Sequence, residues 1–92
     1  MSNVRTAAIE AQDTFTQPLD IGPGGFSLSI SGTFAATVFI QRSFDGGANW
    51  HDVASYTTAI EDAGNEPVGA LYRVGVKTGG YTSGTVNVRL SQ

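Results

Sequence analysis

The sequence predicts a small all-β domain, an antiparallel β-sandwich or jelly-roll-like barrel of six to seven short strands. Glycine, serine and threonine make up 30 of the 92 residues, and the larger apolar residues are mostly Val, Ile and Phe. This composition is typical of strands joined by tight turns. Apolar and polar residues alternate in several short runs, which glycine-rich turns separate. The length predicts one domain, residues 1–92.

The N-terminal part has the weakest pattern. Residues 1–13 show little periodicity, so we expect an N-terminal arm there and the sandwich in residues 14–92. The first candidate strand covers residues 14–21. Pro18 cannot donate a ladder hydrogen bond, which predicts an edge strand or a bulge. After the "GPGG" turn, the run "FSLSIS" alternates as a half-buried strand does, with its Phe, Leu and Ile on one face.

Two strands are predicted around a central hairpin. Residues 36–43 form the first, and Phe39 points away from its core face. In the second, Trp50, Ala54 and Tyr56 are expected to share the core face.

The C-terminal third predicts a loop and two strands. Residues 60–69 are polar and irregular, and Pro67 excludes an inner strand there. The runs "ALYRVGVK" and "TVNVRLS" alternate again, and the turn "GGYTSG" separates them.

The hairpin carries the most specific motif in the chain, Ser43-x-Asp45-x-Gly47-x-x-Trp50. It resembles the Asp-box of sialidases and other β-propellers, whose residues are structural. An aspartate in such a turn accepts backbone N–H bonds, and glycine adopts backbone angles that other residues resist. A propeller needs at least four four-stranded blades, more than 92 residues can supply. The motif therefore predicts a structural hairpin, with no catalytic role.

Composition also argues against several classes of function. The net charge is −3, and the five basic residues are scattered, so we expect no nucleic-acid partner. No apolar run approaches the roughly 20 residues of a membrane span, so we expect no membrane partner. The chain has no cysteine and one histidine, which excludes disulfides and Cys/His zinc sites. We expect neither a cofactor nor a metal.

No constellation of side chains predicts an enzyme. His51 and Asp52 are consecutive strand residues, so their side chains point to opposite faces and do not form a dyad. Glu61, Asp62 and Glu66 lack the alternating ligand pattern of calcium loops, and a solvated acidic loop is the favoured interpretation.

The order of motifs from residue 24 onward resembles a family of small tailed-phage virion proteins. The matching segments are "FSLSISG", "ATVFIQRS", "FDGGANW", "SYT", "EDAGNEP", "LYRVGV" and "SGTVNVRLS". The resemblance implies a capsid decoration (cement) protein that binds the outer head surface and stabilises the lattice. It further implies location in the virion and contact with the major capsid protein. Because residues 1–13 lack a hydrophobic signal core, we expect assembly in the host cytoplasm. The alternative is a carbohydrate- or receptor-binding module of a phage fibre or tail, for which Tyr81 is the one aromatic expected to be exposed.

We also expect a homo-oligomer, most simply a trimer, because the small core has no disulfide or metal to support it. The trimer number comes mainly from the resemblance and from the threefold positions of capsid lattices. Some candidate interface residues are apolar and lie off the predicted core face or in the arm. Arg42 and Arg73 are also candidate interface residues, because we expect at least one of them to pair with an acidic residue of the 60–69 loop or of a neighbouring subunit. The candidates are Val4, Ile9, Phe39, Phe44, Leu71, Arg42 and Arg73.

Overall fold

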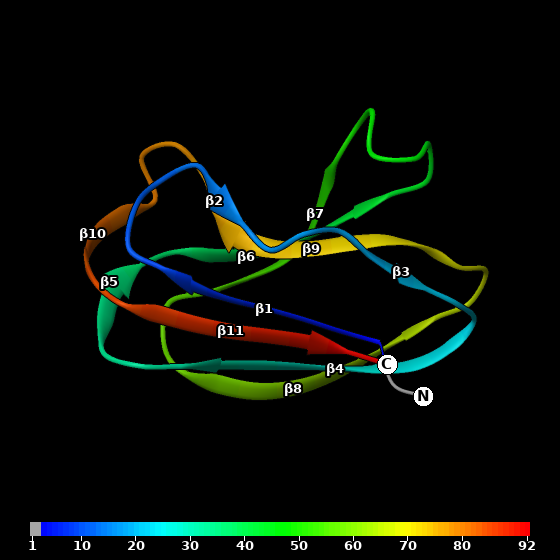
Figure 1. Cartoon of the computed structure of the whole chain (residues 1–92), viewed down its shortest axis with the longest axis horizontal. Coiled ribbons are helices and arrows are strands. Elements are labelled where there is room, and N and C mark those ends of the chain that lie inside the picture. Colours follow the sequence, from blue (N-terminus) through cyan, green and yellow to red (C-terminus); the bar gives the residue numbers. More distant parts are fainter. Residues whose placement is uncertain (1–2) are drawn as a thin grey trace.

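The computed structural model of the chain describes residues 3–92, which form an antiparallel β-sandwich. This architecture confirms the all-β prediction. Two sheets face each other, and a short third sheet lies across one end of the sandwich (Figure 1). Within residues 3–92, no helix has the length and apolar character needed to cross a membrane.

One layer is a four-stranded sheet in the order β1-β11-β4-β8. Every neighbouring pair in it is antiparallel. The first two strands in this order are neighbours, and beyond their paired residues Asn3 and Gln92 exchange two backbone hydrogen bonds. The strands are β1 (Val4–Ile9), β11 (Val86–Ser91), β4 (Gly24–Ser31) and β8 (Ile60–Glu66).

The other layer is a five-stranded sheet in which β9 pairs with β6 on one side and with both β2 and β3 on the other. Pro18 lies in the gap between β2 and β3, at the edge position that its missing N–H predicts. Thr16 bridges this gap, because its N–H donates to the Val74 carbonyl and its Oγ1 accepts from the Val74 N–H. The strands are β2 (Thr14–Phe15), β3 (Leu19–Ile21), β9 (Ala70–Val76), β6 (Val38–Ser43) and β7 (His51–Tyr56).

A two-stranded sheet, β5 (Phe34–Ala36) with β10 (Tyr81–Gly84), covers one end of the sandwich (Figure 1). The main core lies between the two larger sheets. It is built by the alternation seen in the sequence, since the inward residues of β4 and β11 face those of β9 and β6. The buried apolar residues are Ile9, Leu19, Ile21, Phe26, Leu28, Ile30, Val38, Ile40, Ala70, Tyr72, Val74, Val76, Val86, Val88 and Leu90.

The expected N-terminal arm is wrong for residues 4–9. These residues form β1, which pairs with β11 along its whole length, and Ile9 is 0% exposed in the core. An edge strand over the rim of a core buries few side chains, so its sequence alternates weakly. Only Ala7 and Ile9 of β1 join the core. Met1 and Ser2, also part of the expected arm, lie outside the described residues.

The expected irregular loop at 60–69 is also wrong. Residues 60–66 form β8, an edge strand paired with β4, and Pro67 follows its end. The structure therefore contains eleven strands within residues 3–92, where six to seven were expected. Besides β1 and β8, the expected turn "GGYTSG" contributes β10. The expected strand at 14–21 divides into β2 and β3, and that at 36–43 is interrupted at Thr37.

A β-bulge in β7 corrects the expected orientation of Trp50. Ile40 pairs with Ala54, but Gln41 pairs with Asp52, so Val53 is the extra residue. The bulge reverses the alternation, so that Ala54 packs against the core while Asp52 and Trp50 lie on the outer face.

Candidate functional site

The β6–β7 hairpin extends beyond the sandwich (Figure 1). Side chains of its own loop hold it together. Ser43 Oγ donates to Asp45 Oδ1 at 2.7 Å and accepts from the Gly47 N–H at 2.9 Å. Asp45 accepts from the Asn49 backbone N–H at 2.9 Å and from the Asn49 side-chain amide at 2.7 Å. These bonds, the Asn49 backbone N–H above all, hold the pKa of Asp45 well below its usual range.

The glycines of this hairpin let the chain turn. Gly46 and Gly47 have φ angles of +74° and +96°, in the left-handed region that side chains disfavour. The Trp50 ring and the Leu71 side chain lie beside Gly47. Each motif residue thus has a contact that shapes the turn.

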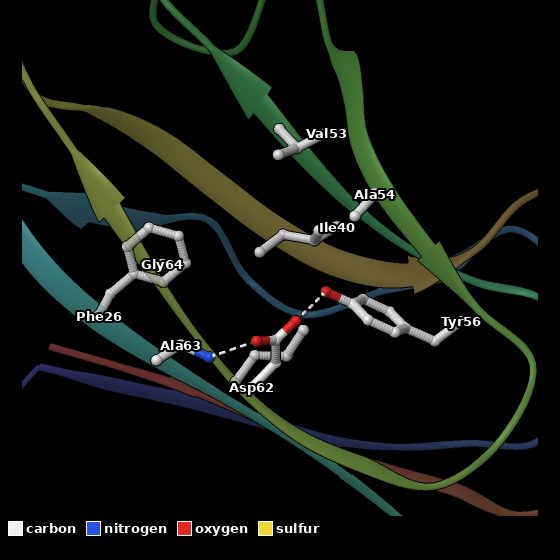
Figure 2. Close-up of a pocket in the computed structure, with 9 residues that line it drawn as sticks. Phe26, Ile40, Val53, Ala54, Tyr56, Asp62, Ala63 and Gly64 are labelled. Carbon is white, nitrogen blue, oxygen red and sulfur yellow. Dashed lines mark hydrogen bonds between the residues drawn. The ribbon is translucent and has the colours of Figure 1, made fainter.

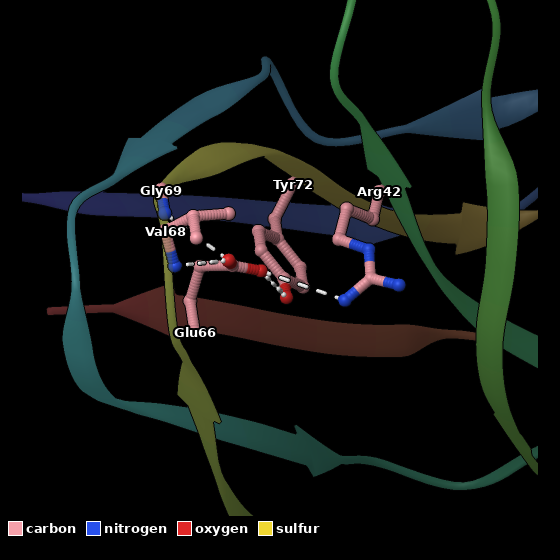
Figure 3. A network of polar contacts seen from close by, with 5 residues as sticks. All are labelled: Arg42, Glu66, Val68, Gly69 and Tyr72. Carbon is pink, nitrogen blue, oxygen red and sulfur yellow. Dashed lines mark hydrogen bonds and ion pairs between the residues drawn. The ribbon is translucent and has the colours of Figure 1, made fainter.

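A second polar group lies at the end of β8 and is centred on Glu66, which is 0% exposed (Figure 3). One carboxylate oxygen accepts from the Val68 and Gly69 N–H groups at 2.9 and 3.1 Å. The other accepts from the Tyr72 hydroxyl at 2.7 Å and lies 3.5 Å from Arg42 Nη1. These partners outweigh the effect of burial and lower the pKa of Glu66, with the Val68 N–H making the largest contribution.

Arg42 completes this network from β6. The pairing expected for at least one of the two arginines is therefore made, within one chain, by Arg42 and Glu66. The Arg42 guanidinium also lies over the Phe44 ring, 4.7 Å from its centroid. Its Nε is buried without a hydrogen-bond partner in the described part of the chain. The network ties β6, β8 and β9 together and is structural.

A different arrangement occupies the outer face of the five-stranded sheet. The Arg73 guanidinium lies between two aromatic rings, 4.1 Å from the Phe15 centroid and 4.4 Å from the Trp50 centroid. Its Nε donates to Gln41 Oε1 at 2.8 Å. Burial against these neighbours lowers the pKa of Arg73.

The contacts continue across the same face. Gln41 Nε2 donates to Asp52 Oδ1 at 2.8 Å, and Lys77 Nζ donates to Asp52 Oδ2 at 2.7 Å. The Lys77 ammonium also lies 4.0 Å from the Phe39 ring centroid. We call this set of side chains the aromatic–cation cluster; it comprises Phe15, Phe39, Gln41, Trp50, Asp52, Arg73 and Lys77.

Local features of the sequence build the cluster. Alternation along β9 turns Arg73 and Gly75 outward. Gly75 has no side chain, and the Phe15 ring occupies the space that a Cβ there would need. Alternation puts Trp50 and Asp52 on one face, and the bulge at Val53 makes it the outer face. The cluster is therefore fixed by backbone geometry as well as by its own contacts.

The opposite outer face, on the four-stranded sheet, has another character. Its central row pairs Arg89 with Ser29 and Ser29 with Glu61. The Ser29 hydroxyl donates to the Glu61 carboxylate, and Arg89 is exposed and donates to Ser91 Oγ. Small polar side chains dominate this face, and among residues 3–92 no aromatic ring lies under Arg89.

An apolar cavity of about 110 Å³ opens between the edge strands β7 and β8 (Figure 2). Phe26, Ile40 and Ala54 are among its lining residues. The Asp62 carboxylate accepts from the Tyr56 hydroxyl and from the Ala63 N–H, both at 2.8 Å, and thereby links the two strands. Ligand pockets commonly have volumes of about 300–1,000 Å³, so this cavity is too small for a cofactor.

The predicted interface residues fall into separate places. Phe39, Leu71 and Arg73 lie on the outer face of the five-stranded sheet, on or beside the cluster. Phe44 is 59% exposed on the hairpin. Two candidates lie elsewhere and one is internal: Val4 is half-buried on β1, Arg42 binds Glu66, and Ile9 is buried in the core.

Four members of the cluster were missed from sequence. Phe15, Gln41, Asp52 and Lys77 gave no motif, although the alternation of β6 does place Gln41 on the same face as Phe39. Their positions depend on the pairing of β2 with β9 and on the bulge in β7.

Within residues 3–92, no group of three or more His, Cys, Asp or Glu side chains is placed to hold a metal ion. Comparison with known proteins found no matching family model, curated protein or solved structure.

Proposed function

We propose that this chain is a non-enzymatic structural protein that binds a larger protein assembly through the outer face of its five-stranded sheet. The observation that carries the proposal is the aromatic–cation cluster, with Arg73 held between Phe15 and Trp50. Aromatic residues and arginine are enriched at the centres of protein interfaces and supply most of their binding energy. Rings and cations already held in place lose little conformational entropy on binding.

The assembly we propose is the head of a tailed phage. The order of motifs from residue 24 onward, which resembles small phage virion proteins, supports this choice. The partners would be the major capsid protein and other copies of this chain, as a trimer on the outer head surface. Phe44, exposed on the hairpin and in contact with Arg42, offers such partners a second apolar contact.

The alternative is a carbohydrate- or receptor-binding module of a fibre or tail. Sugar platforms need aromatic faces that are free to stack. The Arg73 guanidinium covers one face of Trp50, and Tyr81 is half-buried with its hydroxyl donating to the Gly84 carbonyl. These contacts favour a protein partner over a glycan, and a glycan array with the purified chain tests the alternative directly.

The main test adds the purified chain to phage capsids that lack decoration and images the particles by electron cryomicroscopy. We expect density on the outer surface with the five-stranded sheet toward the capsid or a neighbouring copy. Sedimentation equilibrium measures the self-association of the free protein, and the images show its arrangement on the particle. We expect a trimer in at least one of the two states. Bare capsids at saturating protein would overturn the proposal, as would attachment through the four-stranded sheet.

A further inference from the structure

Arg73 differs from Arg42 and Lys77 because it has no ion-pair partner in the described part of the chain. It differs from the exposed Arg5 and Arg89, which also form no ion pair within residues 3–92, because it lies against aromatic rings. Lys77 binds Asp52 and Arg42 binds Glu66, so both are neutralised within the chain. Among residues 3–92, no carboxylate lies within ion-pair distance of Arg73, and its one hydrogen bond goes to the amide oxygen of Gln41. The cluster thus carries one positive charge without a counter-charge.

The geometry around Arg73 limits how a ligand can approach. The rings of Phe15 and Trp50 lie over the guanidinium at 4.1 and 4.4 Å, and Nε is occupied by Gln41. The two terminal nitrogens have no acceptor among residues 3–92, and they are not among the buried unpaired atoms. A ligand therefore reaches the guanidinium at its two terminal nitrogens, whose N–H groups form part of the planar fork of an arginine side chain.

This arrangement matches a planar carboxylate. Two parallel N–H donors bind the two oxygens of a carboxylate in a bidentate pair, which is stronger and more directional than a single contact. The contacts with Phe15 and Trp50 and the hydrogen bond to Gln41 restrict the positions that the guanidinium can take. A polyanion such as nucleic acid fits less well, because the chain carries a net charge of −3. In addition, the negative charge of Asp52 is close to Arg73, since Gln41 is hydrogen-bonded to both residues.

From these observations we infer that Arg73 is a carboxylate-binding site, and that the partner protein presents an Asp or Glu side chain to it. The inference rests on the proposed function, because it assigns a ligand to the same face. It adds the chemistry of the contact: the central residue of the partner's surface is acidic, and Phe15 and Trp50 form its apolar surroundings.

The first experiment uses the isolated, isotope-labelled chain in solution. The probe is the peptide acetyl-Gly-Glu-Gly-amide, and the matched peptide acetyl-Gly-Gln-Gly-amide is the ligand control, both at constant ionic strength. NMR follows the indole N–H of Trp50, the only tryptophan, and the Arg73 guanidinium. We expect a saturable shift of both signals with the glutamate peptide alone.

Three variants give this titration its specificity. Arg73→Gln should abolish the saturable shift, and Arg73→Lys, which keeps the charge but loses the fork, should weaken binding about tenfold. Arg89→Gln, on the opposite outer face, should bind as the wild type does. Backbone spectra check that each variant is folded. If Arg73→Gln is unfolded, the comparison of wild type with Arg73→Lys tests the inference instead. Equal shifts with both peptides, or shifts that survive in Arg73→Gln, would overturn the inference.

The second experiment measures occupancy on undecorated capsids at limiting protein concentration. We expect Arg73→Gln to reduce occupancy about tenfold relative to Arg89→Gln. Capsid binding that is indifferent to Arg73 would overturn the inference and leave the proposed function standing. Carboxylate binding in solution without any capsid binding would overturn the proposed function and leave the carboxylate site at Arg73 standing.

Discussion

Arg42 and Arg73 lie on adjacent strands of one sheet, yet they belong to two different kinds of polar site. Arg42 faces the side of the buried Glu66, within a network that spans three strands. Arg73 lies on the outer face, between two aromatic rings and without a carboxylate. The inner site is neutralised by the chain itself, whereas the outer site keeps an unmatched charge. The comparison is consistent with our proposal that the outer site serves binding, whereas the contacts of the inner site serve folding.

The cost of each site to folding follows from this difference. Removing either a buried carboxylate or its hydrogen-bond partners lowers the unfolding free energy strongly, because no water replaces the lost bonds. A half-exposed guanidinium that is removed leaves its neighbours accessible to water. Stability measurements therefore test the comparison most directly.

The largest effect is expected at the inner site. Glu66→Ala leaves the Tyr72 hydroxyl and the Val68 and Gly69 N–H groups without an acceptor, and we expect it to cost about 3–5 kcal/mol of unfolding free energy. Arg73→Gln, its counterpart on the outer face, removes two cation–π contacts of about 0.5–1 kcal/mol each, the range for accessible sites, and should cost about 2 kcal/mol or less. Urea unfolding of both variants measures the difference. Equal costs would break the comparison, because Arg73 would then be as structural as Glu66.

The strands predicted from the sequence are those that bury a full alternating face. Phe26, Leu28 and Ile30 are all buried, as their spacing indicates. The edge strands β1 and β8 were missed because each contributes few side chains to the core. In β8 the buried end is the carboxylate of Glu66, which no hydrophobic pattern can reveal.

The candidate site was predicted only in part, for a related reason. Phe39, Leu71 and Arg73 lie off the core face, and strand alternation alone places them outside. Trp50 was assigned to the core because the alternation was carried through Val53 without the bulge. Phe15 reaches Arg73 through the pairing of a two-residue strand with β9, a long-range contact that local sequence does not encode.

An intermediate effect is expected when pH is varied. The folded-state pKa of Glu66 is lowered, so its stabilising contribution is complete above the ordinary glutamate value of 4.5 and is lost as pH falls through the folded-state value. Glu66→Gln removes this titration. We expect the wild type to be the more stable at neutral pH, and its advantage over Glu66→Gln to shrink below about pH 4.5. Thermal melts of both proteins from pH 7 to pH 2 measure this.

The other carboxylates with lowered pKa values, those of Asp45, Asp52 and Asp62, titrate in both proteins and cancel in the difference. Parallel pH profiles for wild type and Glu66→Gln would show that the inner network does not hold a charged carboxylate. The contrast with the outer site would then lose its electrostatic basis.

The smallest effect is expected for the ion pair at the rim of the aromatic–cation cluster. Asp52 and Lys77 are about two-fifths exposed, and Lys77 is the main cause of the lowered pKa of Asp52. A double-mutant cycle with Asp52→Asn and Lys77→Met should give a coupling of about 0–1 kcal/mol that weakens in 1 M salt, as exposed pairs do. A coupling near that of the Glu66 network would mean that the outer face is held together for folding. A small, salt-sensitive coupling is what we expect of a binding surface. The Lys77–Asp52 ion pair can then break, and each group can bind a partner protein instead, with little loss of free energy.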